Sequence, residues 1–363
     1  MRVAFVCTDP GIPVDGSKGA SVHVQQIVRA FQRRGDDVTV YATRSGSAEM
    51  GGAPIVTVPV GRGDAADRER AVARAAVQIA ERIADDGCDL VYERLSLFSD
   101  VSARVAAPAV VEVNAPLIEE QRTHRTLVDE TGATAAVRRV LSRAATVACV
   151  SEPVAEWALA HGSADASTIV APNGVDTRAF APAELRDGIL EVVFIGSLKS
   201  WHGVDIAIAA IADLEGVRLT IIGDGPERER LEGVADALGA DVRWLGAIPH
   251  EAVPAELAAM HVGVAPYPAT ADAYFSPLKA FEYLAAGLAV VASETGQIPS
   301  LIAHDDTGIL VPAGGVDALR GALTTLRDDR GLARRLGSAG RARAVSQHDW
   351  DRTLDRILPG GFR

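Results

Sequence analysis

The sequence has few cysteines, few aromatic residues and almost no lysine. Only three of its 36 basic residues are lysines, and 5% of its 363 residues are aromatic. The odd number and wide spacing of Cys7, Cys88 and Cys149 argue against a disulfide scaffold or a zinc site. No apolar run reaches the ~20 residues that cross a bilayer, and MRVAFVCTDP does not have the form of a signal peptide. These absences predict a cytoplasmic protein with reduced thiols.

The charge balance argues against nucleic acid as a partner. The formal net charge is −12, with 19 basic against 23 acidic residues in 1–180 and 17 against 25 in the rest. Neither part has the excess of positive charge that binding a phosphate backbone requires. The hydrophobic fraction of 48% is ordinary for a globular protein, and the length favours two domains over one.

Two series of alternating strands and helices predict two mainly parallel sheets. The first series has six expected strands, at 2–9, 36–42, 89–94, 109–114, 146–151 and 168–172, and the second has six at 191–196, 218–223, 242–246, 262–267, 289–293 and 308–312. Between the two series, Pro, Gly and Asn cluster and the periodic pattern is lost. We predict an N-terminal domain at 1–172, a linker at 173–188, a C-terminal domain at 189–346 and a final helix at 347–363 that crosses back.

The expected fold class is therefore α/β, with two Rossmann-like, doubly wound parallel-sheet domains facing a central cleft. Ligands of open parallel sheets bind outside the carboxyl ends of the strands. The loops that follow the strands are thus the candidate functional segments.

A candidate anion site follows the strand at 191–196. Gly196 ends the strand, a short loop carries Ser197, Lys199 and His202, and the next helix begins after Gly203. Backbone N–H groups and the positive end of the helix dipole attract anions, and Lys199 adds a full charge. An ordinary turn with one solvated lysine is the alternative interpretation.

A second candidate segment is YFSPLKAFEYLAAG. Ser276 suits a helix N-cap, Pro277 suits the first helical position, and Lys279 falls in the first turn. A lysine there opposes the helix dipole at a cost of ~0.3–1 kcal/mol, which a bound anion would offset. Glu282 lies further along this helix, where its carboxylate can accept two hydrogen bonds from a ribose diol; an exposed helical glutamate is the alternative.

With these two segments, the chain as a whole resembles the retaining glycosyltransferases of family GT4, which have the GT-B fold. Seven segments match in the family's order: KGASVHVQQIVRAFQRRGDDVTVYA, VAPNGVDTRAF, FIGSLKSWHGVD, TIIGDGPERERLE, RWLGAIPHEAVPAELAAMHVGVAPY, YFSPLKAFEYLAAGLAVVAS and TGILVP.

The resemblance implies that the C-terminal domain binds a nucleoside-diphosphate sugar. The family's paired glutamates are represented by Glu282, expected on the ribose hydroxyls, whereas Tyr274 replaces the first, as in a sub-group that carries FSPLK. The family's phosphate-binding Arg and Lys fall near Ser197 and His202, which leaves Lys199 as the expected cation with His202 as a helper. The implied donor-binding residues are Gly196, Ser197, Gly223, Gly225, Ala247, Ile248, Ser276, Pro277, Leu278, Lys279 and Glu282.

The resemblance also implies that the N-terminal domain binds the acceptor. Asn114 stands where other members often have a histidine close to the reacting sugar, and with Lys199 and His202 it forms the expected catalytic set. The implied acceptor-binding residues are Lys18, Gly19, Ser21, His23, Glu93 and Arg94. For His23, a buried helix histidine with a hydrogen-bond partner is an equally good interpretation.

The predicted reaction moves a hexosyl group to an acceptor hydroxyl with retention of configuration, and it needs neither a metal nor a cofactor besides the donor. The one Asp-x-Asp, Asp349 to Asp351, lies in a predicted helix, and the histidines show no ligand spacing. A same-fold 2-epimerase and a non-catalytic sugar-nucleotide binder are the alternatives. A dinucleotide-dependent oxidoreductase is disfavoured because no G-x-G-x-x-G follows a strand.

The acceptor and the oligomeric state are not predicted. A small molecule, a lipid and a glycan are all compatible acceptors. Five arginines between 121 and 143 favour at most a peripheral contact with the inner face of a membrane.

Overall fold

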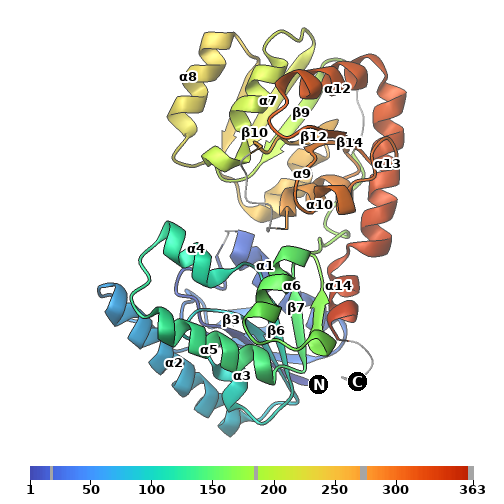
Figure 1. The fold of residues 1–363 in the computed structure, drawn as a ribbon. Helices are drawn as coiled ribbons and strands as arrows, with labels where there is room; N and C mark the ends of the chain where they lie inside the picture. The colour runs from blue at the N-terminus through green and yellow to red at the C-terminus, as the bar shows by residue number, and fades with distance from the viewer. Residues whose placement is uncertain (17–18, 184–186, 270–275, 359–363) are drawn as a thin grey trace. The chain divides into compact units, whose positions relative to one another are not determined.

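The computed structural model describes residues 1–16, 19–183, 187–269 and 276–358, and the chain forms two compact units. Unit 1 contains Met1–Asn173 and Trp350–Arg363, together with a short segment ending at Ser276. Unit 2 contains Gly174–Ala273 and Pro277–Asp349. Each unit is built on its own sheet, with helices on both faces (Figure 1).

The sheet of unit 1 has eight strands in the order β3-β4-β2-β1-β5-β6-β7-β8, and all neighbours are parallel except β3 and β4. The strands are β1 (Arg2–Cys7), β2 (Asp37–Ala42), β3 (Glu49–Met50), β4 (Ala53–Thr57), β5 (Leu90–Arg94), β6 (Ala109–Val113), β7 (Thr146–Cys149) and β8 (Thr168–Val170). The six predicted strands are confirmed. The edge pair β3 and β4 was not predicted, because these strands are short and only partly buried.

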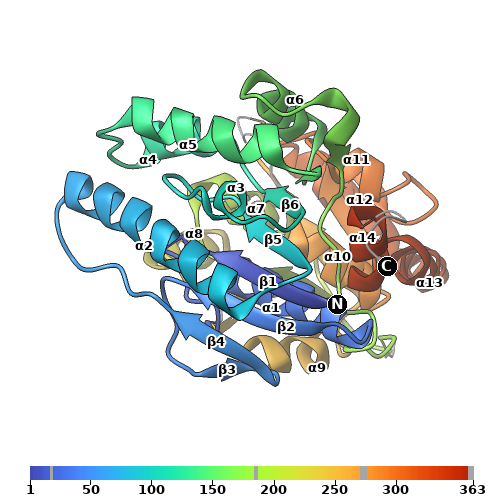
Figure 2. The same cartoon turned by 90° about the horizontal axis from the view of Figure 1, so that it is seen from below.

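Helices cover both faces of this sheet because the strand residues that point to either face are largely apolar. They are α1 (Gly19–Arg33), α2 (Ala65–Asp86), α3 (Val101–Arg104), α4 (Leu117–His124), α5 (Glu130–Arg143), α6 (Glu152–Ala160) and α14 (Trp350–Ile357). Ala4 and Val6 of β1 pack with Ile79 of α2, and Figure 2 shows α2, α3 and α5 on this side. On the other side, Phe31 of α1 lies edge-on to Tyr92 of β5.

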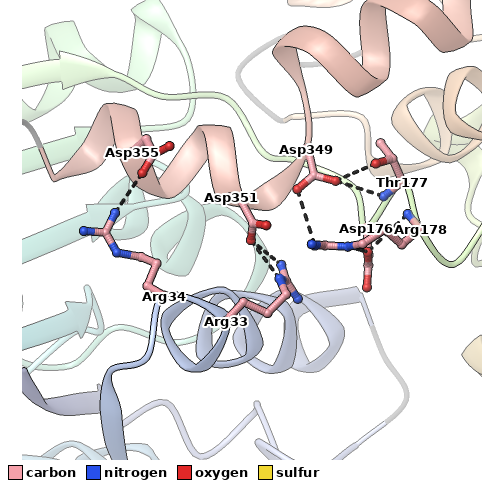
Figure 3. Close-up of polar contacts among 8 residues, drawn as sticks. All are labelled: Arg33, Arg34, Asp176, Thr177, Arg178, Asp349, Asp351 and Asp355. Atoms are coloured by element: carbon pink, nitrogen blue, oxygen red, sulfur yellow. Dashed lines mark hydrogen bonds and ion pairs between the residues drawn. The ribbon is translucent and has the colours of Figure 1, made fainter.

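The C-terminal helix α14 packs against α1 within unit 1. Arg33 pairs with Asp351 at 2.6 Å and Arg34 pairs with Asp355 at 2.8 Å, as drawn in Figure 3. Trp350 is buried, and its ring lies edge-on to the ring of His23 at 4.9 Å. Helix α14 therefore covers part of α1.

The sheet of unit 2 has six strands in the order β11-β10-β9-β12-β13-β14, all parallel. The strands are β9 (Leu190–Ile195), β10 (Val217–Ile222), β11 (Val242–Gly246), β12 (Val262–Ala265), β13 (Ala289–Ser293) and β14 (Ile309–Val311), and all six were predicted. The helices are α7 (Val204–Ile211), α8 (Arg228–Leu238), α9 (Val253–Leu257), α10 (Leu278–Ala285), α11 (Ile298–Leu301), α12 (Val316–Asp328) and α13 (Arg330–Gln347).

Three helices of unit 2 were not predicted from the sequence: α12, α13 and the four-residue α11. The regular apolar residues Leu319, Leu323 and Leu326 of α12 are buried and would have predicted it. The buried side of α13 is made largely of small residues, including Gly337 and Gly340, so its amphipathic pattern is weak. Among the described residues, no helix combines the length and the hydropathy needed to cross a membrane.

Part of the stretch predicted as a linker packs onto unit 2. Val175 N–H donates to the carbonyl of His348 at 2.9 Å. Oδ2 of Asp349 accepts hydrogen bonds from N–H and Oγ1 of Thr177, at 3.2 and 2.6 Å (Figure 3). Phe180 is also buried, so these residues are ordered by long-range contacts that their sequence does not reveal.

The hydroxyl of Tyr283 on α10 joins two neighbouring strands of unit 2. It accepts a hydrogen bond from Ile195 N–H at the end of β9, at 2.8 Å, and donates to the carbonyl of Val264 on β12, at 3.3 Å. The ring packs so closely on β12 that a Cβ at Gly263 would lie 2.3 Å from it. Tyr283 therefore fixes the end of β9, from which the first candidate loop leaves.

We expect Tyr283→Phe to lower the free energy of unfolding by about 1–3 kcal/mol, because it leaves the partly buried Ile195 N–H without the partner it has in the structure. Tyr41→Phe is the matched control, since the carboxylate that Tyr41 contacts, Asp86, is also bound by Arg82. Urea denaturation measures both variants. An unchanged transition midpoint in Tyr283→Phe would show that its hydroxyl does not stabilise the strand end.

Candidate functional site

Two residues of the loop after β9 have backbone conformations that favour glycine. Gly196 has φ of +144° and Gly203, just before α7, has φ of +62°. A Cβ at Gly203 would lie 1.8 Å from the carbonyl oxygen of Pro266. The loop and the start of α7 are thus held closely against the segment that follows β12.

Gly223 and Gly225, both predicted to line the nucleotide, allow the loop after β10 to pack on the loop after β9. A Cβ at Gly223 would lie 2.0 Å from the carbonyl oxygen of Gly196, and one at Gly225 would lie 2.4 Å from that of Leu198. The loops are joined by hydrogen bonds from Leu198 N–H to Asp224 O and from Glu227 N–H to Leu198 O, at 3.0 and 3.2 Å. This packing explains both glycines, and their contact with a nucleotide stays a prediction.

His202 is oriented by the same loop. Its Nδ1 lies 2.6 Å from the carbonyl oxygen of Ser197. Because a carbonyl only accepts, Nδ1 carries the proton, and Nε2 is the acceptor in the neutral ring. Burial and then the nearby Lys279 lower the pKa of His202 to about 4. The ring is therefore neutral at physiological pH, and the predicted donation to a phosphate would require a change of tautomer or protonation.

Lys279 places its amine in an aromatic enclosure at the end of β9. Its side chain is 8% exposed, and Nζ lies 4.4 Å from the ring centroid of Phe194 and 5.1 Å from that of Tyr267. Nζ has no hydrogen-bond partner among the described residues. Burial lowers the pKa of this amine to about 7, while the carboxylate of Glu282 acts in the opposite direction.

Lys199, the cation expected from the sequence, has a more open environment. It precedes the short 3₁₀ turn Ser200–His202, and its Nζ lies 5.6 Å from the ring centroid of Trp201. That indole is 48% exposed. Lys199 and Lys279 therefore belong to one region of unit 2 but differ strongly in burial.

Glu282, the predicted ribose ligand, is paired with a histidine that the sequence analysis did not single out. Oε1 of Glu282 lies 3.0 Å from Nε2 of His250. His250 follows Ala247 and Ile248, the predicted base-lining residues, so the pair connects α10 to the loop after β11. No local pattern marks His250, because its partner is 32 residues away along the chain.

Of the other residues predicted in this segment, the structure describes Ser276, Pro277 and Leu278. Ser276 was predicted at the N-cap and Pro277 at the first helical position, but α10 begins one residue later: Pro277 occupies the N-cap position without a capping hydrogen bond, and Leu278 is the first residue. Oγ of Ser276 accepts a hydrogen bond from Asn173 N–H at 3.3 Å, within unit 1. Tyr274 and Lys18 lie outside the described residues.

In unit 1, a buried polar cluster gathers several predicted acceptor residues around Glu112 of β6. Oε1 of Glu112 lies 2.5 Å from Nε2 of His23, and Oε2 lies 3.8 Å from Nη1 of Arg94. Burial raises the pKa of Glu112, but His23, Arg94 and Asn114 together outweigh it and hold the pKa below its usual value. Glu112 was not predicted, although a carboxylate inside the apolar strand AVVEVN was a usable signal.

The other predicted acceptor residues are mainly buried. Glu93 is fully buried, and its oxygens accept hydrogen bonds from Oγ of Ser99 and N–H of Ser102, at 2.6 and 2.8 Å. Ser21 is buried in α1, whose first residue is Gly19. The structure thus gives Glu93 a role in ordering the chain before α3, and its contact with an acceptor stays a prediction.

Two family profiles match the two parts of the chain. The one described as Glycosyltransferase Family 4 matches residues 17–179, and the one described as Glycosyl transferases group 1 matches residues 190–329. Between them they cover most of the sequence. The chain therefore belongs to the family 4 glycosyltransferases.

Curated relatives and solved structures agree with this assignment. The phosphatidyl-myo-inositol mannosyltransferase of Mycolicibacterium smegmatis is 26% identical over 99% of this chain and 92% of its own length. The GDP-mannose-dependent alpha-(1-6)-phosphatidylinositol monomannoside mannosyltransferase of Mycobacterium tuberculosis is 33% identical, but the match spans only 54% of this chain and 55% of the relative. Sucrose-phosphate synthase of Thermosynechococcus elongatus has the same fold, with a TM-score of 0.75, 20% identity and coverage of 98% and 97%. The predicted GT-B fold is confirmed.

We expect Lys279→Met to stabilise the protein at neutral pH. The unfolded chain holds the lysine proton up to its usual pKa near 10.5, whereas the folded amine loses it near pH 7. Below pH 10.5 the charged lysine therefore lowers the free energy of unfolding. The gain in Tm should be several degrees at or below about pH 7 and should fade towards about pH 10. Thermal unfolding across pH measures it, with Lys199→Met as the control that should not change Tm. A lower Tm at pH 7 would contradict the described environment.

We expect Glu112→Ala to destabilise unit 1 by about 3–5 kcal/mol, because it leaves the partly buried Arg94 without its counter-charge and the buried His23 without its hydrogen-bond partner. Since the pKa of Glu112 is lowered in the folded state, its stabilisation is present above its usual pKa of 4.5 and is lost as the pH falls through the lowered value. Denaturant unfolding measures the loss. The exposed Glu130, which pairs with Arg122, gives the control Glu130→Ala with a cost of about 1 kcal/mol or less. Equal costs would contradict the proposed pairing.

Proposed function

We propose that this protein transfers a hexosyl group from a nucleoside-diphosphate sugar to a hydroxyl group of an acceptor. The observation that carries the proposal is the arrangement at the carboxyl end of β9, where Gly196, the start of α7 and the first turn of α10 converge around Lys279. Backbone N–H groups at helix starts and a nearby cation are suited to a diphosphate. Glu282 of the same helix is suited to the two hydroxyls of a ribose.

These residues support a mechanism in which the leaving diphosphate is stabilised by fixed groups of the protein. As the sugar acquires positive character, negative charge develops on the phosphate, and pre-positioned amides and ammonium groups lower the energy of that state. We propose same-face attack by the acceptor hydroxyl, with its proton passing to the departing phosphate. This gives retention of configuration, and the protein groups named here supply the charge without a metal.

Unit 1 is the proposed source of acceptor contacts. The buried pair of His23 and Glu112 orders the region in which Arg94 and half-buried Asn114 end their strands. The names of the relatives make GDP-mannose the first donor to test and an inositol phospholipid the first acceptor, with a sugar or glycan acceptor as the next possibility. Work on such a lipid fits a cytoplasmic protein with a peripheral membrane contact.

Binding of GDP, UDP, ADP, CMP and TDP, with and without EDTA, tests the donor class. A ligand at ~100 times its Kd adds about 2.7 kcal/mol to the folded state, so one nucleoside diphosphate should raise Tm by several degrees with EDTA present. Glu282→Ala should abolish most of that shift, because the ribose loses its carboxylate acceptor. Lack of any shift in the unaltered protein would overturn the proposal.

The anomeric configuration of the product tests the mechanism. With GDP-mannose and an acceptor that supports turnover, NMR should show the donor's α configuration in the product. An inverted product would contradict same-face attack, whereas binding without transfer or donor hydrolysis would favour the non-catalytic binder. A 2-epimer of the donor sugar would instead identify an epimerase.

A further inference from the structure

The pairing of His250 with Glu282 joins two segments that are distant along the chain. Nε2 of His250 lies 3.0 Å from Oε1 of Glu282 on α10, and His250 begins the 3₁₀ turn His250–Ala252 after β11. β11 is an edge strand of unit 2, whereas the ring of Tyr283 on α10 packs on β12, with β10 and β9 between the two strands. The contact therefore links the loop of an edge strand to a helix on a central strand.

Other contacts hold both segments in place. Within the turn, Ala252 N–H donates to the carbonyl of Pro249 at 2.9 Å. Helix α10 is anchored by the buried ring of Phe281. The side chains of His250 and Glu282 are themselves partly accessible, at 27% and 15%. The effect of the histidine on the carboxylate therefore explains its presence better than a contribution to folding does.

His250 fixes the direction of the carboxylate. A carboxylate only accepts hydrogen bonds, so Nε2 of His250 is the donor. Within the part of the chain that the structure describes, His250 is the only hydrogen-bond donor to the side chain of Glu282. Without it, the torsions of a partly exposed glutamate are free to change. The two oxygens together accept about four hydrogen bonds, so the carboxylate can accept others while it is held.

We infer that His250 is a positioning residue, which acts through Glu282 to make the site select ribonucleotides over 2′-deoxyribonucleotides. The held carboxylate accepts hydrogen bonds from the 2′- and 3′-hydroxyls of the donor ribose. The inference rests on the proposed function, in which Glu282 contacts the ribose, and deepens it by naming the residue that sets this selectivity. It requires no contact between His250 and the nucleotide.

Selectivity follows from the number of hydroxyls that the carboxylate meets. A 2′-deoxy nucleotide gives it one hydrogen bond instead of two, and a hydrogen bond to a charged group contributes about 10- to 100-fold in affinity. Both hydroxyls are met together only when the carboxylate faces both, whereas one bond tolerates many orientations. Loss of His250 should therefore weaken the second bond more than the first, and so reduce the preference for ribose.

Two variants that both carry an amide test the role of Nε2. Glutamine places its amide nitrogen about where Nε2 lies, whereas asparagine is one methylene shorter and does not reach Glu282. Calorimetric titration compares GDP, UDP and ADP, each with its 2′-deoxy form. We expect the ribonucleotide to be preferred about 10- to 100-fold by the unaltered protein and by His250→Gln. The preference should be about 3- to 10-fold smaller in His250→Asn, and in His250→Ala if the asparagine variant does not fold.

A double-mutant cycle tests whether His250 acts through Glu282. Glu282→Ala should lower the preference to less than about threefold, and His250→Asn should change it less than about twofold further in that background. His304→Asn is the matched control. His304 pairs with the exposed Asp305 before β14, at the amino end of the parallel strands, so its loss should leave the preference unchanged.

The ratio of the two affinities separates positioning from a structural role. A histidine that only held the loop after β11 would affect both forms equally, so an unchanged ratio in His250→Asn would overturn the inference. Equal losses in His250→Gln and His250→Asn, or a further loss in the Glu282→Ala background, would also contradict it. In each of these cases the proposed function stands.

The unaltered protein alone gives two further decisive outcomes. If it binds a nucleoside diphosphate but does not prefer the ribose form, the inference is wrong, while donor binding stands. If it binds none of the diphosphates, the proposed function and the inference are both overturned.

Discussion

The proposed donor site of unit 2 depends on one amine, that of Lys279, which is buried at the end of β9 and has no hydrogen-bond partner among the residues that the structure describes. The closely packed glycines and the hydroxyl of Tyr283 fix the backbone around it. Burial of this amine lowers the stability of unit 2, which is common for a group that binds a ligand.

In unit 1, by contrast, the buried carboxylate of Glu112 is surrounded by partners. Glu112 lies between His23 and Arg94, and its pKa is held low because His23, Arg94 and Asn114 together outweigh burial. Removal of any member leaves the others uncompensated, so this cluster is expected to be structurally demanding. The two sites differ in this respect: Glu112 has Arg94, His23 and Asn114 around it, whereas the described residues give the amine of Lys279 no hydrogen-bond partner.

The sequence predicted most of the fold because buried parallel strands appear as continuous apolar runs. All six strands of unit 2 were located in this way. β3 was missed because it has only two residues, and β4 was missed although it lies in the apolar run APIVTVPV at 53–60. The helix α13 was missed because small residues form its buried side.

The site was predicted only in outline. The scarcity of lysine singled out Lys199 and Lys279, but both lie in similar Gly- and Pro-containing segments, and burial of the second depends on Phe194 and Tyr267, which only the fold brings together. His250 and Glu112 were missed for the same reason, because their partners are distant along the chain.

Because the chain has only three lysines, NMR of protein labelled at lysine Cε and Nζ gives the most direct measurement. A pH titration should show one lysine with a pKa of about 7, which disappears in Lys279→Met. Addition of a bound nucleoside diphosphate should move the first upwards. If Lys279 itself titrates near the usual 10.5 in the free protein, its amine is not buried as described here.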